Sequence, residues 1–144
     1  MTPVSTARIL VADDQLDILQ AVRFLLLDSG YETDLVSSVG DVMDRMSTQT
    51  YDLLLMDLNY TRDTTSGREG LDLLDRVRAK DPGLPVVVMT GWGSIDTAVE
   101  AMRRGARSFV QKPWDDTTLI EVVSREVAEG QAARRRDSRF SRDF

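Results

Sequence analysis

Short runs of apolar residues alternate along this chain with stretches of helical periodicity, and this alternation limits the folds open to it more than any other feature. The three clearest runs are residues 9–12, 53–56 and 86–89. Each run is continuously apolar, which is typical of strands that helices cover on both faces. A weaker run at 109–110 and a run with polar interruptions at 31–36 predict strands at the edges of the sheet.

Apolar residues spaced three or four positions apart fill the segments between these runs and predict five helices. In chain order, the helices are marked by Ile18, Val22, Leu25 and Leu26; Val39, Val42, Met43 and Met46; Leu71, Leu74 and Val77; Ile95, Ala98, Val99 and Met102; and Leu119, Ile120, Val123 and Val127. Asp115 or Asp116 can cap the last helix. Strands and helices that alternate in this way predict an α/β fold, a flavodoxin-like doubly wound parallel sheet of five strands in the order 2-1-3-4-5 with five helices.

The composition excludes several kinds of chemistry. The 144 residues include no cysteine and no histidine, so disulfides, thiol nucleophiles and the commonest ligands of transition metals are absent. A bound metal would therefore be a hard cation held by oxygen. No apolar run approaches the ~20 residues of a membrane span, and the first residues lack the layout of a signal peptide. We therefore expect a soluble cytoplasmic protein that does not contact a membrane.

Charge is unevenly distributed along the chain. The net charge is −6, but residues 134–144 carry five arginines and only two aspartates, so residues 1–133 stand at −9. We expect this acidic body to make no direct contact with nucleic acid. We predict an N-terminal lead at 1–6, one domain at 7–129 and a basic linker or tail at 130–144. That last segment either prolongs the final helix or stays unfolded, and nucleic-acid binding by its arginines is the alternative role.

Polar side chains follow four of the predicted strands. Asp13 and Asp14 come after the first strand, Asp57 after the third, Thr90 after the fourth and Lys112 after the fifth. Ligands of open α/β sheets bind at this carboxyl edge of the strands. Taken singly, each residue has an ordinary explanation as a helix cap, a turn residue or a solvated side chain. Their convergence on one edge predicts a site.

The residue types at this edge favour phosphoryl chemistry. Carboxylates that lie a few ångströms apart repel one another, and a divalent cation relieves that repulsion. Ligands that are all oxygens predict Mg²⁺ or Mn²⁺, which keeps several waters and leaves room for a phosphoryl oxygen. The Lys112 ammonium and the Thr90 hydroxyl suit the remaining phosphoryl oxygens. Asp57 is then the predicted nucleophile.

The motifs around these residues resemble a known family. They are the segments 10–14 (LVADD), 55–59 (LMDLN), 88–91 (VMTG) and 109–113 (FVQKP). Over about residues 7–129, the chain resembles the receiver domain of a bacterial two-component response regulator. Three further segments are similar to receivers attached to sigma-54-dependent transcriptional activators, namely 89–94 (MTGWGS), 101–106 (AMRRGA) and 111–114 (QKPW).

The resemblance implies a role for each residue at the edge. Asp57 accepts a phosphoryl group from a phosphohistidine of a sensor histidine kinase, and Lys112 pairs with that group. Asp14 and Asp57 bind Mg²⁺ directly together with the backbone carbonyl of Asn59, while Asp13 helps through water. Since the chain has no histidine, it cannot be its own histidine phosphodonor.

The resemblance also implies a switch, which catalyses only its own phosphorylation and dephosphorylation and is not otherwise an enzyme. Thr90 moves to hydrogen-bond the phosphoryl group and Phe109 rotates inward, although packing at the sheet edge is an alternative role for Phe109. The resemblance also implies that the Lys112–Pro113 bond is cis. This is a specific expectation, because only about 5–6% of X-Pro bonds in folded proteins are cis. The switched surface comprises the fourth helix, fifth strand and fifth helix. It serves a homodimer or an effector domain that controls transcription and is missing from this chain.

Two other functions remain open from the sequence. A phosphohydrolase similar to the haloacid-dehalogenase group also uses an aspartate nucleophile, Mg²⁺, a threonine and a lysine. Such enzymes need a second aspartate two residues after the nucleophile, where this chain has Asn59. A flavodoxin-like cofactor carrier would hold phosphate after the first strand, where Asp13 and Asp14 would repel it.

One segment departs from the family pattern. Receivers usually carry a proline four residues after the phosphoacceptor and a glycine about four residues further on. Here the matching glycine is Gly70, after an insertion of about five residues in the polar loop 60–67. The loop hydroxyls either contact the phosphoryl group or are solvated. Trp92, two residues past Thr90, is expected near the mouth of the site.

Overall fold

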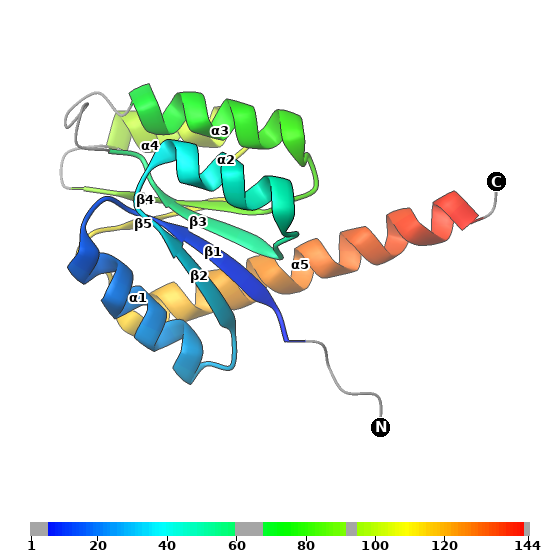
Figure 1. Cartoon of the computed structure of the whole chain (residues 1–144), viewed down its shortest axis with the longest axis horizontal. Coiled ribbons are helices and arrows are strands. Elements are labelled where there is room, and N and C mark those ends of the chain that lie inside the picture. Colours follow the sequence, from blue (N-terminus) through cyan, green and yellow to red (C-terminus); the bar gives the residue numbers. More distant parts are fainter. Residues whose placement is uncertain (1–5, 60–67, 92–94, 143–144) are drawn as a thin grey trace.

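The computed structural model describes residues 6–59, 68–91 and 95–142, with side chains as far as residue 136. Five parallel strands form one sheet in the order β2-β1-β3-β4-β5 (Figure 1). They are β1 (Arg8–Ala12), β2 (Glu32–Val36), β3 (Leu53–Asp57), β4 (Val86–Thr90) and β5 (Ser108–Gln111). The predicted flavodoxin-like fold and strand order are confirmed.

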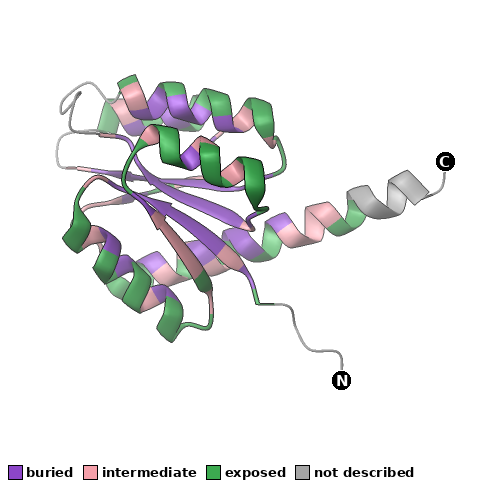
Figure 2. Ribbon diagram, viewed as in Figure 1, coloured by how far each residue is buried: buried purple, intermediate pink, exposed green. Residues whose placement is uncertain are grey.

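Five helices cover the two faces of the sheet. They are α1 (Leu16–Asp28), α2 (Val39–Thr48), α3 (Arg68–Lys80), α4 (Ile95–Arg103) and α5 (Asp116–Arg142). Helices α1 and α5 lie on one face, and α2, α3 and α4 lie on the other (Figure 1). The central strands are buried almost throughout (Figure 2).

Burial on both faces explains why the central strands are continuously apolar. Successive side chains of a strand point to opposite faces of the sheet. Leu10 and Leu54 therefore pack on the side of α2, α3 and α4, whereas Ile9 and Leu55 pack on the side of α1 and α5. Each of these four side chains is fully buried.

The predicted helix ends follow from local hydrogen bonds. At the end of α1 the Ser29 N–H donates to the Leu25 carbonyl at 3.1 Å, and Gly30 takes a φ of 92° that favours glycine. At the start of α5 the Thr118 N–H donates to Asp115 Oδ2 at 3.1 Å. Asp115 rather than Asp116 is therefore the cap of α5.

The apolar stripe predicted for the fourth helix faces outward for the most part. Ile95, Val99 and Met102 are 52%, 45% and 39% exposed, while Ala98 and Ala101 are fully buried. The two alanines face the sheet because their small side chains let the short helix α4 lie close to it. The neighbouring stripe of large side chains is consequently left on the surface.

Helix α5 runs past the end of the sheet as a long extension (Figure 1). Of the two possibilities that the sequence left open for residues 130–142, the structure has the helical one. Gly130 lies in this helix, and a Cβ there would come within 2.6 Å of Pro85 Cγ, so glycine permits a close contact. The predicted boundary after residue 129 stays a prediction, and most of the predicted N-terminal lead lies outside the described residues. Among the described helices, none is long and apolar enough to cross a membrane.

Candidate functional site

The carboxyl edge of the sheet brings the predicted polar residues together. Asp13 follows β1 directly, Asp57 and Thr90 end β3 and β4, and Lys112 follows β5. Asp13, Asp14 and Asp57 can each offer one carboxylate oxygen such that all three atoms lie within 4.8 Å of one another. The topology therefore unites groups that lie up to a hundred residues apart in the chain.

Lys112 holds the two buried carboxylates of this cluster. Its Nζ donates to Asp13 Oδ2 at 2.6 Å and lies 3.4 Å from Asp57 Oδ2. Asp13 is fully buried, and Asp57 is only 4% exposed. The backbone N–H of Lys112 donates to the Thr90 carbonyl at 2.7 Å, which ties the lysine to the end of β4. A single ammonium group thus faces two carboxylates that water hardly reaches.

Backbone N–H groups two residues further along the chain orient both buried carboxylates. The Gln15 N–H donates to Asp13 Oδ1 at 2.9 Å, and the Asn59 N–H donates to Asp57 Oδ1 at 3.2 Å. Sequence reasoning missed these two donors. The signal was available, because an aspartate at the end of a strand commonly accepts a hydrogen bond from the backbone two residues on.

Burial raises the pKa of Asp57 to about 6, because removal from water disfavours the carboxylate. The Lys112 ammonium opposes this rise, the Asp13 carboxylate adds to it, and the Asn59 N–H opposes it. A nearby cation would stabilise the ionised form. The electrostatics of the site therefore favour a bound positive charge.

The donor set fits Mg²⁺. Three carboxylates converge without any nitrogen or sulfur ligand, which is the ligand chemistry that hard divalent cations prefer. Asp14 and Asn59 are half-buried beside the two buried aspartates, so the cluster opens towards solvent on one side. Mg²⁺ commonly keeps several waters, and that open side gives them room.

The remaining predicted residues differ in their surroundings. Thr90 is 1% exposed, and its hydroxyl has no hydrogen-bond partner among the described residues. Phe109 is 43% exposed on β5 and points away from the core. The Lys112–Pro113 bond is cis, as the family resemblance implied. The predictions for Trp92 and for the loop 60–67 concern residues outside the described part of the chain.

Gly70 lies in close contact with the segment that follows the phosphoacceptor candidate. A Cβ on Gly70 would overlap the backbone of Leu58, the residue after Asp57. Only glycine lets the first turn of α3 lie against this segment. The structure thereby gives a steric reason for a glycine at the position that the sequence comparison matched to Gly70.

Comparison with known proteins assigns the family. The family model for the response regulator receiver domain matches residues 9–124 of this chain. The chain belongs to this family. It is 33% identical over 119 residues to the response regulator protein FleR of Pseudomonas aeruginosa, covering 83% of this chain and 24% of FleR. It is 31% identical over 120 residues to the transcriptional regulatory protein ZraR of Escherichia coli, covering 83% of this chain and 26% of ZraR.

Solved structures agree with this assignment. The crystal structure of the receiver domain of NtrX from Brucella abortus has a TM-score of 0.77 and 36% identity, with 83% of this chain and 98% of that chain covered. A longer NtrX crystal structure from the same organism has a TM-score of 0.83 and 34% identity, covering 92% of this chain and 29% of that one. The chain is a receiver domain of a two-component response regulator, and it spans about a quarter of the length of the curated relatives it matches.

We expect the affinity of this receiver for Mg²⁺ to depend on pH below about 6, because a proton and the cation compete for Asp57. With a pKa of about 6, the apparent dissociation constant should be nearly constant from pH 7 to 8. It should rise up to about tenfold per pH unit below 6. Titration calorimetry at several pH values measures this, and a constant affinity from pH 5 to 7 would contradict it.

The raised pKa of Asp57 also predicts how its contribution to stability changes with pH when Mg²⁺ is absent. Because Asp57 binds more protons in the folded state than in the unfolded state between about pH 4 and 6, the contribution of Asp57 to the free energy of unfolding should fall as the pH rises through that window. Urea unfolding of wild type and Asp57→Asn at several pH values measures this contribution.

Proposed function

We propose that this receiver takes a phosphoryl group from a sensor histidine kinase onto Asp57 and thereby switches a protein-binding surface. Mg²⁺ is held by Asp14, Asp57 and the Asn59 backbone carbonyl, with Asp13 helping through water. The observation that carries this proposal is the convergence of three carboxylates, each with an oxygen within 4.8 Å of the others, beside the Lys112 ammonium. Mg²⁺ supplies positive charge for the phosphoryl oxygens during transfer.

The transfer step uses the ionised carboxylate of Asp57. An Asp57 oxygen forms a bond to phosphorus, and the bond from phosphorus to the nitrogen of the donor imidazole breaks. The electron pair of that bond stays on the imidazole nitrogen, which takes up a proton. Lys112, already 3.4 Å from Asp57 Oδ2, is positioned to pair with a phosphoryl oxygen. The Thr90 hydroxyl is available as a donor, since it has no partner among the described residues.

We expect Asp57→Asn to abolish phosphoryl incorporation, because an amide oxygen is a poor nucleophile. The protein is incubated with acetyl phosphate with Mg²⁺ or with EDTA, and intact mass reports the adduct. Wild type should be labelled only with Mg²⁺, and Asp28→Asn, an exposed aspartate at the end of α1, should be labelled like wild type. Equal labelling of Asp57→Asn would contradict the proposal. Many turnovers on a generic phosphate ester would support the phosphohydrolase alternative.

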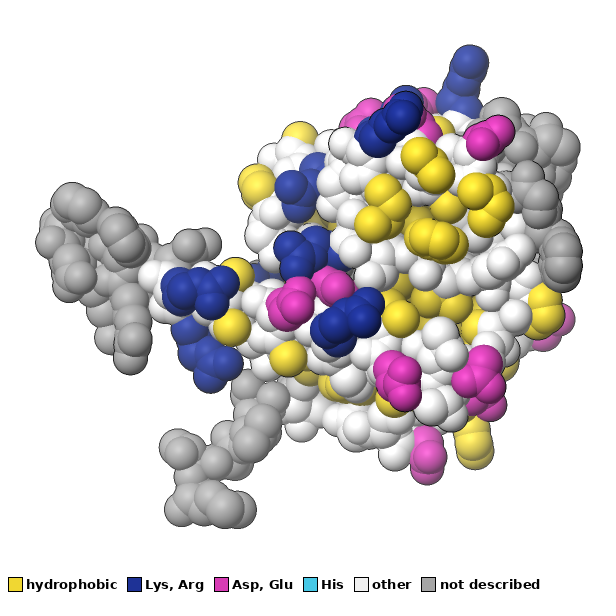
Figure 3. Space-filling model, turned by 180° about the vertical axis from the view of Figure 1, so that it is seen from behind, with side chains coloured by type: hydrophobic (Ala, Val, Ile, Leu, Met, Phe, Trp, Pro, Cys, Tyr) yellow, Lys and Arg dark blue, Asp and Glu magenta, His cyan; other side chains and the backbone are white. Residues whose placement is uncertain are grey.

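The switched surface that we propose lies over α4, β5 and α5. Ile95, Val99, Met102 and Phe109 are all exposed there, and hydrophobic side chains gather on this face of the molecule (Figure 3). The face is contiguous with the site, because Thr90 pairs with Gln111 and Val88 pairs with Phe109 in the β4–β5 register. A movement of Thr90 can therefore alter the position of the neighbouring residues of β5 directly.

We expect beryllofluoride, which mimics a phosphoryl group on Asp57, to shift the chain from monomer to dimer. Moving a population from 1:99 to 99:1 needs about 5.5 kcal/mol of preference for the active state. Size-exclusion chromatography with light scattering measures the shift, and Val99→Glu should prevent it while phosphoryl labelling continues. An unchanged size of the chain with beryllofluoride would contradict homodimerisation. An effector domain would then remain as the proposed partner of this surface.

The names of the relatives support the wider setting that we propose. Several relatives are named as transcriptional regulatory proteins, and the segments 89–94, 101–106 and 111–114 resemble receivers of sigma-54-dependent activators. We therefore propose that this receiver belongs to a cytoplasmic transcriptional regulator that also carries an effector domain.

A further inference from the structure

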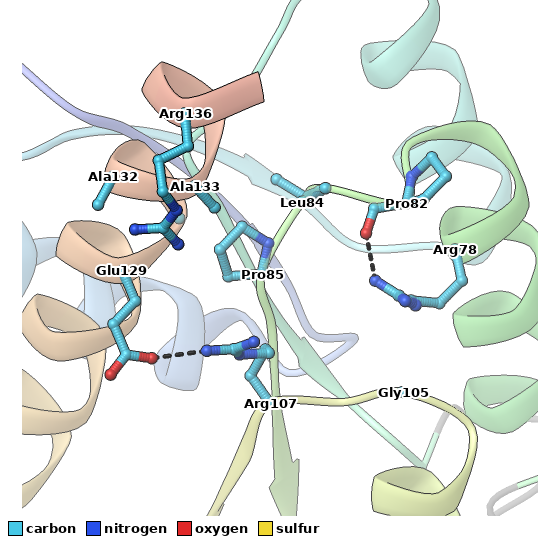
Figure 4. Close-up of a pocket in the computed structure, with 12 residues that line it drawn as sticks. Arg78, Pro82, Leu84, Pro85, Gly105, Arg107, Glu129, Ala132, Ala133 and Arg136 are labelled. Atoms are coloured by element: carbon cyan, nitrogen blue, oxygen red, sulfur yellow. Dashed lines mark hydrogen bonds and ion pairs between the residues drawn. The ribbon is translucent and has the colours of Figure 1, made fainter. Parts of the chain in front are cut away.

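A pocket lies at the end of the sheet opposite to Asp57, where α5 leaves the body of the domain (Figure 4). Its walls come from the end of α3, the α3–β4 loop, the turn before β5 and residues 129–136 of α5. Its volume is about 580 Å³, within the range of about 300–1,000 Å³ that is usual for small-molecule sites. The metal centre uses none of its residues.

Three arginines from three different segments line this pocket, namely Arg78, Arg107 and Arg136. Arg107 donates to Glu126 at 3.0 Å and to Glu129 at 2.6 Å through Nε and Nη2. Those carboxylates offset its charge, and its Nη1 remains as a further donor.

Arg78 and Arg136 differ from Arg107 in that neither is paired with a carboxylate anywhere in the described part of the chain. Arg78 donates to the Pro82 carbonyl at 2.5 Å, which leaves its charge uncompensated. Arg104, by contrast, lies within 3.1 Å of both Asp75 and Glu100. Figure 4 shows Arg78 and Arg136 on opposite sides of Pro85. Two uncompensated positive charges thus face one pocket on a body whose net charge is strongly negative.

Two glycines shape the pocket walls. Gly105 has a φ of 107°, and a Cβ there would lie 2.6 Å from Arg78 Nε. At Gly130, a Cβ would meet Pro85 Cγ at the same distance. Glycine at both positions makes room for the Arg78 guanidinium and for the close approach of α5, so the pocket is already formed without a ligand.

We propose that this pocket binds a small molecule that carries two or more phosphate groups. Guanidinium groups bind phosphate oxygens through paired hydrogen bonds, and two separate uncompensated guanidiniums call for two anionic groups. Leu84, Pro85, Ala132 and Ala133 supply an apolar wall between them. A concave cavity enclosed by three segments suits a compact ligand better than an extended acidic protein segment.

Such a ligand would fix the direction of the α5 extension. It would bridge Arg78 of α3 and Arg136 of α5, beside the ion pair that already joins Arg134 to Asp81 at 3.2 Å. Ligand binding should therefore protect the amides of residues 130–136 from hydrogen exchange. This inference does not depend on phosphorylation of Asp57.

The test is a titration of the whole chain with inorganic tripolyphosphate without Mg²⁺ at about 0.15 M salt, followed by calorimetry and amide NMR shifts. We expect saturable one-site binding with the largest shifts at Gly105 and Gly130. Arg78→Gln and Arg136→Gln should each weaken binding about tenfold, as the loss of a charged hydrogen bond does. Arg135→Gln, an exposed neighbour outside the pocket lining, should change it less than about twofold, and Asp57→Asn should leave it unchanged.

Several results would overturn the inference. If Arg135→Gln weakened binding as much as Arg78→Gln and Arg136→Gln do, the binding would be general electrostatic attraction to the basic helix. If no saturable binding were seen, the pocket would not be an anion site. Amide NMR shift changes centred on Asp57 would show that the anion binds at the other end of the sheet. Tighter binding of hexaglutamate than of tripolyphosphate at Gly105 and Gly130 would assign the pocket to an acidic protein partner.

Discussion

Lys112→Met should destabilise the protein without Mg²⁺ by about 3 kcal/mol, the loss expected when one partner of a buried ion pair is removed. Lys112 contacts Asp13 at 2.6 Å and Asp57 at 3.4 Å. Both aspartates are almost wholly buried, so the variant leaves two carboxylates close together without an opposing charge. Methionine keeps most of the volume of the side chain, so the effect reports mainly on charge. Urea unfolding at pH 7.5 measures it.

Mg²⁺ should restore much of this stability, because a cation can take the place of the ammonium among the carboxylates. It should therefore stabilise Lys112→Met more than it stabilises wild type. The chain offers a matched control in Lys80, its only other lysine, which is exposed and donates to Ser47 at 3.2 Å. Lys80→Met should change stability by less than about 0.5 kcal/mol. Equal effects of the two substitutions would contradict the electrostatic account of the site.

Gly70→Ala should destabilise the protein by about 1–3 kcal/mol, the usual cost of forcing an extra methyl group into a filled space. The added Cβ would overlap the backbone of Leu58, and backbone at the end of a buried strand cannot move aside cheaply. Because Leu58 follows Asp57 directly, we also expect weaker Mg²⁺ binding. Urea unfolding and calorimetry with Mg²⁺ measure the two effects.

A glycine-to-alanine substitution at Gly40 should change the free energy of unfolding in the opposite direction. Gly40 lies in α2, and a Cβ there would meet nothing within 4 Å. Alanine favours a helix over glycine by roughly 0.5–1 kcal/mol, so Gly40→Ala should stabilise the protein. A Gly70→Ala variant as stable as wild type would show that the start of α3 can move away from Leu58.

The fold and the cluster of carboxylates at the sheet edge were predictable because they depend on patterns that a sequence displays. Strands that are buried on both faces are continuously apolar, as residues 53–56 and 86–89 are. Parallel strands necessarily bring the residues at their carboxyl ends to one edge, so Asp13, Asp57 and Lys112 meet there.

Features that depend on contacts between distant segments were not predictable in this way. Helical periodicity marked Ile95, Val99 and Met102 but does not distinguish a stripe that faces the core from one that is exposed on the surface. The sequence left open whether residues 130–144 prolong the last helix, and it gave no sign that Gly130 lies close to Pro85. No sequence pattern links Arg78 to Arg136, which lie on different helices and line the same pocket.

The most direct test of the central claim is a crystal structure of this receiver with Mn²⁺ in place of Mg²⁺ and with beryllofluoride added. Anomalous scattering from manganese locates the metal directly. We expect one strong peak within coordination distance of Asp14, Asp57 and the Asn59 carbonyl, with beryllofluoride attached to Asp57 and contacted by Lys112 and Thr90. A metal peak remote from these carboxylates, or beryllofluoride bound away from Asp57, would contradict the account.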